Sequence, residues 1–199
     1  MAVIDWTPSA EVATHAGIRE VSLRTKALGK RTIFLTGEIN TESVMDVILQ
    51  LMYLREEDKE QPIRLYINSG GGEVNAGLLL YDVLQDIDVL VDTYCVGIAA
   101  SMAAILFAGG KKGRRYILPH SKVMIHEPLL ANGLGGSASS IKNISDSIIE
   151  TRDIVNGILA KHTGKTKEEI DEATRFDNYM NAEECVEFGL CDKVINGIF

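Results

Sequence analysis

Apolar positions recur along the chain with two spacings, one typical of strands and one typical of helices. Short β-branched and apolar runs predict strands at residues 32–35, 63–68 and 89–96. Apolar stripes spaced three and four residues apart predict a helix after each of these strands. Strands and helices that alternate with short connections predict parallel strands joined by right-handed crossovers. The pattern therefore indicates an α/β fold.

The second half of the chain continues this pattern with shorter elements. The longest helical stripe covers residues 137–161 and ends before Gly164, a typical residue after a helix C-terminus. Thr166 and Asn181 each stand three residues before a glutamate, a capping-box pattern that predicts two short helices. Further short strands are predicted at residues 114–118, 122–125 and 192–195.

The N-terminal stretch, residues 1–30, is weakly patterned, and we expect it to form an arm outside the core. Residues 31–199 contain no internal repeat and no linker, and their length suits a single domain. A glycine-containing loop is expected at residues 132–136.

Composition excludes several classes of function. Apolar residues make up 46% and charged residues 24%, which is typical of a soluble globular protein. The 20 basic and 28 acidic residues give a net charge of −8, which argues against nucleic-acid binding. The apolar run at residues 96–110 is too short to span a bilayer, and no signal peptide is visible. Three cysteines without a C-x-x-C pair favour reduced thiols in a cytoplasmic protein and no zinc site.

Two turns are candidates for chemistry because each follows a predicted parallel strand, where ligands gather in α/β sheets. The first is Ser69–Gly72, whose glycines would suit a phosphate cradle, an oxyanion hole or simply a tight turn. The second surrounds Ser101, which lies among small residues at a strand-to-helix junction. Ser101 is either a nucleophile on a sharp turn or a hydroxyl that caps the next helix.

A serine nucleophile needs a base, and the chain has four histidines. His126 ends a short apolar strand and would be held rigidly there, although a purely structural histidine is an alternative. His15, His120 and His162 lie in the arm, in a polar turn and at a helix end. For the carboxylate that orients the base, Asp177 has few charged neighbours, and we expect it to be half-buried.

Taken together, these segments resemble the ClpP family, the proteolytic subunit of the Clp protease. The resemblance extends from about Thr32 to Ile195. It is carried by four motifs in family order: Ile67-Asn68-Ser69 with Gly71-Gly72, Gly97-x-Ala99-Ala100-Ser101-Met102, Met124-Ile125-His126-x-Pro128, and Asn181-Ala182-Glu183-Glu184.

The resemblance implies a ClpP/crotonase-like parallel-sheet spiral core with a protruding helical handle at about residues 127–163. It also implies a serine endopeptidase in which Ser101, His126 and Asp177 form the catalytic triad. The backbone amides of Gly72 and Met102 would form the oxyanion hole. No metal or organic cofactor is implied for the chain.

The family assembles as two stacked heptameric rings, so self-association is expected. An AAA+ Clp unfoldase would use ATP to feed unfolded polypeptides into the chamber. No nucleic-acid or membrane partner is expected, and the resemblance suggests a cytoplasmic protease of protein quality control.

The chain also departs from the family pattern. The family usually has Pro at Gly70, Gln at Glu127 and a basic residue at Asn178, and residues 134–139 replace its Gly/Gln-rich handle strand. Arg64 and Asp86 occupy positions that usually supply apolar groups to the unfoldase-docking pocket. These departures suggest a divergent paralogue that docks an unfoldase poorly alone and works in a mixed particle with a paralogous ring.

The sequence alone leaves two other functions as alternatives. One is a catalytically silent or partner-dependent ring subunit of a mixed particle. The other is a crotonase-type acyl-CoA enzyme, which would share the fold and an oxyanion hole without needing a Ser–His pair.

Overall fold

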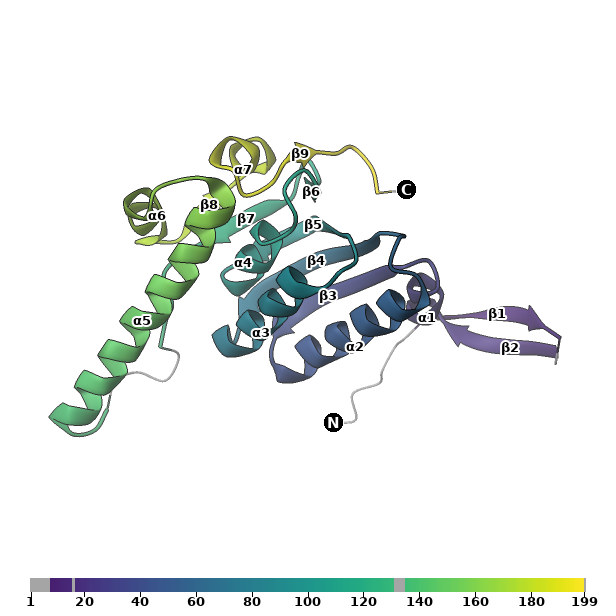
Figure 1. Ribbon diagram of the computed structural model, residues 1–199, viewed down its shortest axis with the longest axis horizontal. Coiled ribbons are helices and arrows are strands. Elements are labelled where there is room, and N and C mark those ends of the chain that lie inside the picture. The colour runs from purple at the N-terminus through teal and green to yellow at the C-terminus, as the bar shows by residue number, and fades with distance from the viewer. Residues whose placement is uncertain (1–7, 16, 131–134, 199) are drawn as a thin grey trace.

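The computed structural model describes residues 8–15, 17–130 and 135–198, which form a mixed α/β fold (Figure 1). Its strands are β1 (Ser9–Thr14), β2 (Gly17–Ser22), β3 (Thr32–Ile39), β4 (Ile63–Gly72), β5 (Val91–Ala100), β6 (Arg115–Ile117), β7 (Lys122–Ile125), β8 (Asn178–Met180) and β9 (Lys193–Val194). Its helices are α1 (Leu23–Leu28), α2 (Thr41–Glu57), α3 (Val74–Asp86), α4 (Met102–Ala108), α5 (Ala138–Thr163), α6 (Lys167–Thr174) and α7 (Ala182–Phe188).

The main sheet is parallel along its length, in the order β3-β4-β5-β6-β9. β7 pairs in parallel with the end of β5, and β8 pairs antiparallel with β7. Helices α2 and α3 lie across one face of this sheet (Figure 1). The predicted α/β class with a parallel sheet is confirmed, and the architecture agrees with the ClpP/crotonase type.

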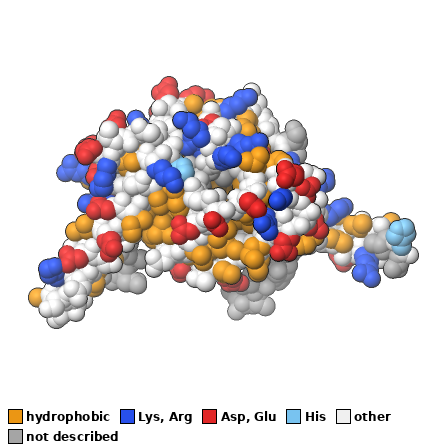
Figure 2. Space-filling model, viewed as in Figure 1, with side chains coloured by type: hydrophobic (Ala, Val, Ile, Leu, Met, Phe, Trp, Pro, Cys, Tyr) orange, Lys and Arg blue, Asp and Glu red, His pale blue; other side chains and the backbone are white. Residues whose placement is uncertain are grey.

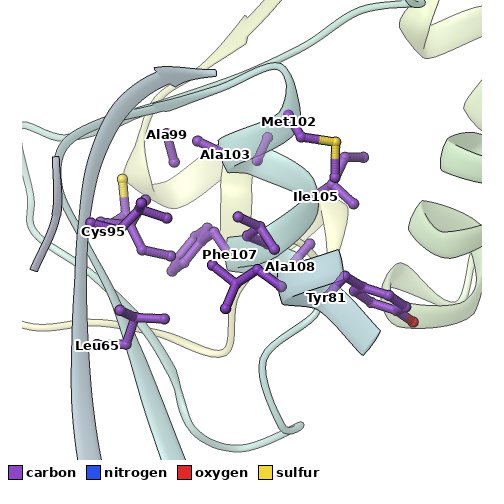
Figure 3. Close-up of a cluster of buried hydrophobic side chains, with 14 of the residues drawn as sticks. Leu65, Tyr81, Cys95, Ala99, Met102, Ala103, Ile105, Phe107 and Ala108 are labelled. Atoms are coloured by element: carbon purple, nitrogen blue, oxygen red, sulfur yellow. The ribbon is translucent and has the colours of Figure 1, made fainter. Parts of the chain in front are cut away.

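The core lies between the sheet and these helices, because alternate strand residues point to the same face. Ile33 and Leu35 of β3, and Leu65 and Ile67 of β4, are at most 1% exposed. Helix α4 is buried at every position, and Figure 3 shows its side chains enclosed between the strands and α3. This buried helix holds the strand-to-helix junction that precedes it in place.

The turn expected at Ser69–Gly72 is wrong, and the turn around Ser101 is confined to the junction after β5. β4 continues through Gly72 and β5 continues through Ala100, each with an irregularity in its register. Gly97 has φ +101°, and a Cβ on Gly72 would lie 2.1 Å from the carbonyl oxygen of Ile39. The glycines therefore allow strands to approach each other closely while they continue.

The N-terminal arm also has more structure than the pattern predicts. β1 and β2 form an antiparallel hairpin that projects from the body (Figure 1), and α1 follows it. The described side chains of β2 are largely exposed, with Ile18 at 71%. The hairpin was missed because neither of its faces is buried in this chain, so its sequence has no clear apolar alternation.

Helix α5 is the protruding element of the fold (Figure 1). Its 26 residues would extend about 39 Å at the usual helical rise. Its buried residues all lie toward its C-terminal end, where Gly164 adopts the left-handed conformation (φ +78°) as expected. The capping boxes at Thr166 and Asn181 are confirmed. Part of the loop expected at residues 132–136 lies outside the described residues.

Within the described part of the chain, no helix is both long and apolar enough to cross a membrane.

Candidate active site

Ser101 occupies the junction between β5 and α4 in a strained backbone conformation. Its φ of +55° and ψ of −124° are unusual for a residue with a side chain and cost on the order of 1–3 kcal/mol. Two features maintain this conformation. The buried helix α4 follows Ser101 directly, and the Ser101 amide donates a hydrogen bond to the Met124 carbonyl at 2.8 Å. Its hydroxyl makes no capping bond to α4, so the helix-cap alternative is wrong.

His126 and Asp177 meet because two strands run antiparallel. Ile125 at the end of β7 pairs with Asn178 at the start of β8, so the next residues outward, His126 and Asp177, face each other. β5 pairs with β7 in the register Ala100 to Met124, which brings Ser101 close to His126 as well. Sheet register alone therefore gathers three side chains that are far apart in the sequence.

The three side chains form one hydrogen-bonded row, called here the Ser–His–Asp row. The distance from His126 Nε2 to Ser101 Oγ is 2.9 Å, and that from His126 Nδ1 to Asp177 Oδ1 is 3.0 Å. A neutral imidazole protonated at Nδ1 satisfies both contacts, since Nδ1–H donates to the carboxylate and Nε2 accepts from the hydroxyl. Such an imidazole is poised to take the hydroxyl proton.

His126 and Asp177 differ in exposure. The side chain of His126 is 14% exposed, whereas that of Asp177 is 59% exposed. The expectation of a half-buried Asp177 is therefore wrong for the isolated chain. Asp177 lies in the short connection between α6 and β8, and this connection rather than burial fixes its position. The next residue, Asn178, anchors the connection because its Nδ2 donates to the Ala173 carbonyl at 3.1 Å.

The glycine strand of β4 lies directly against Ser101. A Cβ on Gly71 would be 2.7 Å from Ser101 Cβ and 3.2 Å from the Met102 amide nitrogen. Gly72 follows it on β4, and Met102 is the first residue of α4, where amides have no partner within the helix. The amides of Gly72 and Met102 thus belong to the two segments that meet at Ser101, which suits the expected oxyanion hole.

Ser69 positions the glycine strand, a role that its sequence pattern does not predict. Ser69 is 2% exposed; its hydroxyl donates to the Gly37 carbonyl (2.6 Å) and accepts from the Gly71 amide (3.1 Å). These bonds fix Gly71 against Ser101. A serine beside three glycines was the only signal, and it did not distinguish a buried hydroxyl from a turn residue.

An apolar recess adjoins the row. Ser101 and His126 line it together with Val74, Met102, Ile105, Ile125, Pro128, Val155 and Leu159. Its volume is about 20 Å³, close to the room that one water molecule needs, so the recess gives the hydroxyl an apolar wall rather than a cavity.

None of the other three histidines reaches the row. His15 and His120 are exposed in loops. His162 is partly buried, with its Nε2 2.9 Å from the Tyr81 hydroxyl. Burial, together with the nearby Lys161 and Arg115 cations, lowers the pKa of His162 to about 4. No group of three or more potential metal ligands occurs within the described ranges.

The fold and the site together define a class of protein. It is a mixed α/β protein with a parallel sheet, in which a hydroxyl, an imidazole and a carboxylate form one hydrogen-bonded series. A family model described as Clp protease matches residues 15–197, and the chain belongs to that family. The resemblance inferred from the four motifs is thereby confirmed. Members of this family are usually serine peptidases.

Proposed function

We propose that this protein is a serine endopeptidase subunit of an ATP-dependent Clp protease and hydrolyses unfolded polypeptides. The observation that carries the proposal is the Ser–His–Asp row, with contacts of 2.9 and 3.0 Å. A crotonase-type acyl-CoA enzyme would not need these contacts, and no feature of the described residues favours it.

The row supports a defined sequence of steps. His126 takes the proton of Ser101 as its Oγ attacks a peptide carbonyl, and Asp177 holds the imidazole tautomer and stabilises the imidazolium. His126 then gives the proton to the leaving amine. In the second half of the reaction, His126 takes a proton from water as the water attacks the acyl-enzyme, and it returns that proton to Ser101 Oγ. The amides of Gly72 and Met102 would stabilise the oxyanion in both halves of the reaction.

Assembly into two stacked heptameric rings is part of the proposal, with residues 31–199 as one peptidase domain and residues 1–30 as an axial arm. Exposed apolar side chains on α2 support a subunit interface there: Leu49, Met52 and Tyr53 are 61%, 52% and 51% exposed. Figure 2 shows hydrophobic surface gathered over this helix. The projecting α5, with exposed Ile149 and Ile154, would be the handle that joins the rings.

The partner unfoldase is proposed to dock on the sheet face opposite α2 and α3. An aromatic row crosses four strands there, with ring centroids 5.4, 4.8 and 4.9 Å apart: Phe34, Tyr66, Tyr94 and Tyr116. Arg64 stands on the same face of β4 as Tyr66 and donates to the Lys30 carbonyl. Asp86 is exposed at the end of α3, on the other side of the sheet from the aromatic row, and makes no ion pair with Arg64 among the described residues.

The Arg64 charge supports weak docking of an apolar unfoldase loop on this face, because covering an unpaired charge costs several kcal/mol. We therefore propose that a paralogous ring supplies the docking face in a mixed particle. ATP-dependent degradation should be slow with this protein alone and fast when the paralogue is added. Processive degradation by this protein alone would contradict that part of the proposal. Three buried, unpaired thiols fit the reducing cytoplasm that we propose as its location.

Labelling with a fluorophosphonate tests the proposed chemistry directly. We expect one label per chain, at Ser101, and a loss of peptidase activity of ~10⁴ or more in Ser101→Ala. Ser145→Ala, which removes an exposed hydroxyl on α5, is the matched control and should label normally. Labelling that persists in Ser101→Ala would overturn the assignment.

A further inference from the structure

A groove leads away from the apolar recess beside Ser101. Its volume is about 830 Å³, and it lies between the start of α3, the segment after β7 and the helix α5. Its apolar lining includes Leu129, Leu130, Ile144 and Ile148. It shares Val74 and Pro128 with the recess, so the two form one continuous surface for a bound peptide.

Glu73 is the only ionisable residue that lines this groove within the described chain. Its side chain is exposed and has no hydrogen-bond or ion-pair partner among the described residues. Glu73 is also the N-cap residue of α3, yet its carboxylate makes no capping bond to that helix. The carboxylate is therefore not used by the fold.

The backbone of Glu73 is nevertheless held firmly. Its amide donates to the Ile39 carbonyl at 2.7 Å, and its carbonyl accepts the first bond of α3 from Gly77 at 3.0 Å. It directly follows Gly72, whose amide we assign to the oxyanion hole. The backbone that carries the Glu73 carboxylate is therefore fixed one residue from the proposed oxyanion hole.

We propose that Glu73 makes this site select peptides that carry Lys or Arg within two residues of the cleaved bond. A long basic side chain can lay its methylene stem along the apolar groove while its charged head pairs with the carboxylate. A peptide carboxylate at the same place would be repelled. This inference rests on the proposed peptidase function and names its substrate class.

The same charge opposes the reaction of neutral peptides. Negative charge develops on the peptide oxygen near Gly72 in the transition state, and a carboxylate one residue away disfavours it. A cation bound at Glu73 offsets that effect. Removal of the charge should therefore slow basic substrates and accelerate neutral ones, two changes of opposite sign that a general loss of structure would not produce.

The experiment uses the assembled protein and a series of quenched fluorescent peptides that share one apolar scaffold. A single residue near the cleaved bond is Lys, Leu or Glu, and it is moved through the two positions on either side. We expect Glu73→Gln to lower the Lys-to-Leu ratio of kcat/KM by about 3- to 5-fold, as loss of an exposed ion pair predicts. Glu73→Lys should shift the preference toward the Glu peptide.

Two controls make the result specific. Glu168→Gln removes an exposed carboxylate on α6, outside the groove, and should leave all ratios unchanged. In the wild-type protein, added salt should reduce the Lys-to-Leu ratio because mobile ions screen an exposed pair.

The possible failures can be told apart. If the wild-type protein labels with fluorophosphonate and cleaves peptides, but the ratios of Glu73→Gln and Glu73→Lys stay within twofold of wild type, Glu73 has no role in specificity. If the wild-type protein neither labels nor cleaves any peptide, the proposed peptidase function itself fails, and this inference fails with it.

Discussion

Replacement of Asp192 by Asn should destabilise the fold far more than the same change at Asp88. Both aspartates accept two hydrogen bonds from the guanidinium of one arginine, so the ion pairs are matched, although Asp192 Oδ2 also accepts from the Gly113 and Arg115 backbone amides. Asp192 receives Arg115 Nε at 3.0 Å and Nη2 at 2.7 Å, and Asp88 receives Arg55 Nε at 2.6 Å and Nη2 at 2.8 Å. The pairs differ in burial, since the Arg115 side chain is 3% exposed and that of Arg55 is 45% exposed.

The expected magnitude follows from what Arg115 would lose. Burial alone would raise the pKa of Asp192, but the bonds from Arg115 outweigh it and the pKa is lowered, so the carboxylate is charged at neutral pH. Without that charge, Arg115 keeps three carbonyl acceptors, on Ala108, His162 and Gly189, but its positive charge is buried and uncompensated. Loss of one partner of such a pair costs about 3–5 kcal/mol.

This cost is large compared with a total stability of about 5–15 kcal/mol for a typical domain. For a chain of this size, each kcal/mol shifts Tm by about 2–4 °C, so Asp192→Asn should lower the apparent Tm by about 6–20 °C. Asp88→Asn should barely change it, because water solvates the remaining arginine. Differential scanning calorimetry of both variants at equal subunit concentration measures the difference. Equal shifts in Tm would refute the argument from burial.

Three further predictions concern the site and its surroundings. Asp177→Asn should lower turnover by ~10⁴ while the protein still assembles; if Asn178→Ala is instead the crippling change, the carboxylate has been misassigned. Burial lowers the pKa of His162 to about 4. Between about pH 6.5 and 4, His162 is therefore protonated in the unfolded chain but not in the folded chain. Stability should therefore decline from pH 6.5 to about 4, and the decline should be shallower in His162→Gln, as pH-dependent Tm values would reveal. Burial raises the pKa of the Cys95 and Cys191 thiols to about 12, so a thiol reagent should react slowly with the native protein and with three thiols per chain in denaturant; rapid labelling of the native protein would contradict this.

The elements that bury one apolar face could be predicted from the sequence, and those defined by backbone contacts could not. Helices α2, α3 and α5 and the parallel strands carry periodic apolar positions, so their order was readable. β8 has only three residues, too few to show a period, yet its pairing with β7 brings Asp177 to His126. The glycine segment was mistaken for a turn because φ values and strand approach have no apolar signature.

The site was only partly predictable for the same reason. Residue chemistry and motif order suggested Ser101, His126 and Asp177, and their mutual distances agree with that choice. The exposure of Asp177 and the supporting role of Ser69 depend on which strands are neighbours. Neither can be obtained from local sequence, because each residue contacts a segment more than 30 residues away.

The position of Asp177 after α5 has a consequence for biosynthesis. Ser101 and His126 directly follow strands β5 and β7 and emerge from the ribosome before the long helix, whereas Asp177 and the strand β8 that follows it emerge after that helix. Asp192, which neutralises Arg115, and the edge strand β9 emerge later still. Since chains begin to fold from the N-terminus during synthesis, the hydroxyl and imidazole can be in place while the carboxylate is still missing. A nascent chain therefore lacks a complete Ser–His–Asp row until β8 has left the ribosome, so the row depends on a strand made well after the hydroxyl and the imidazole.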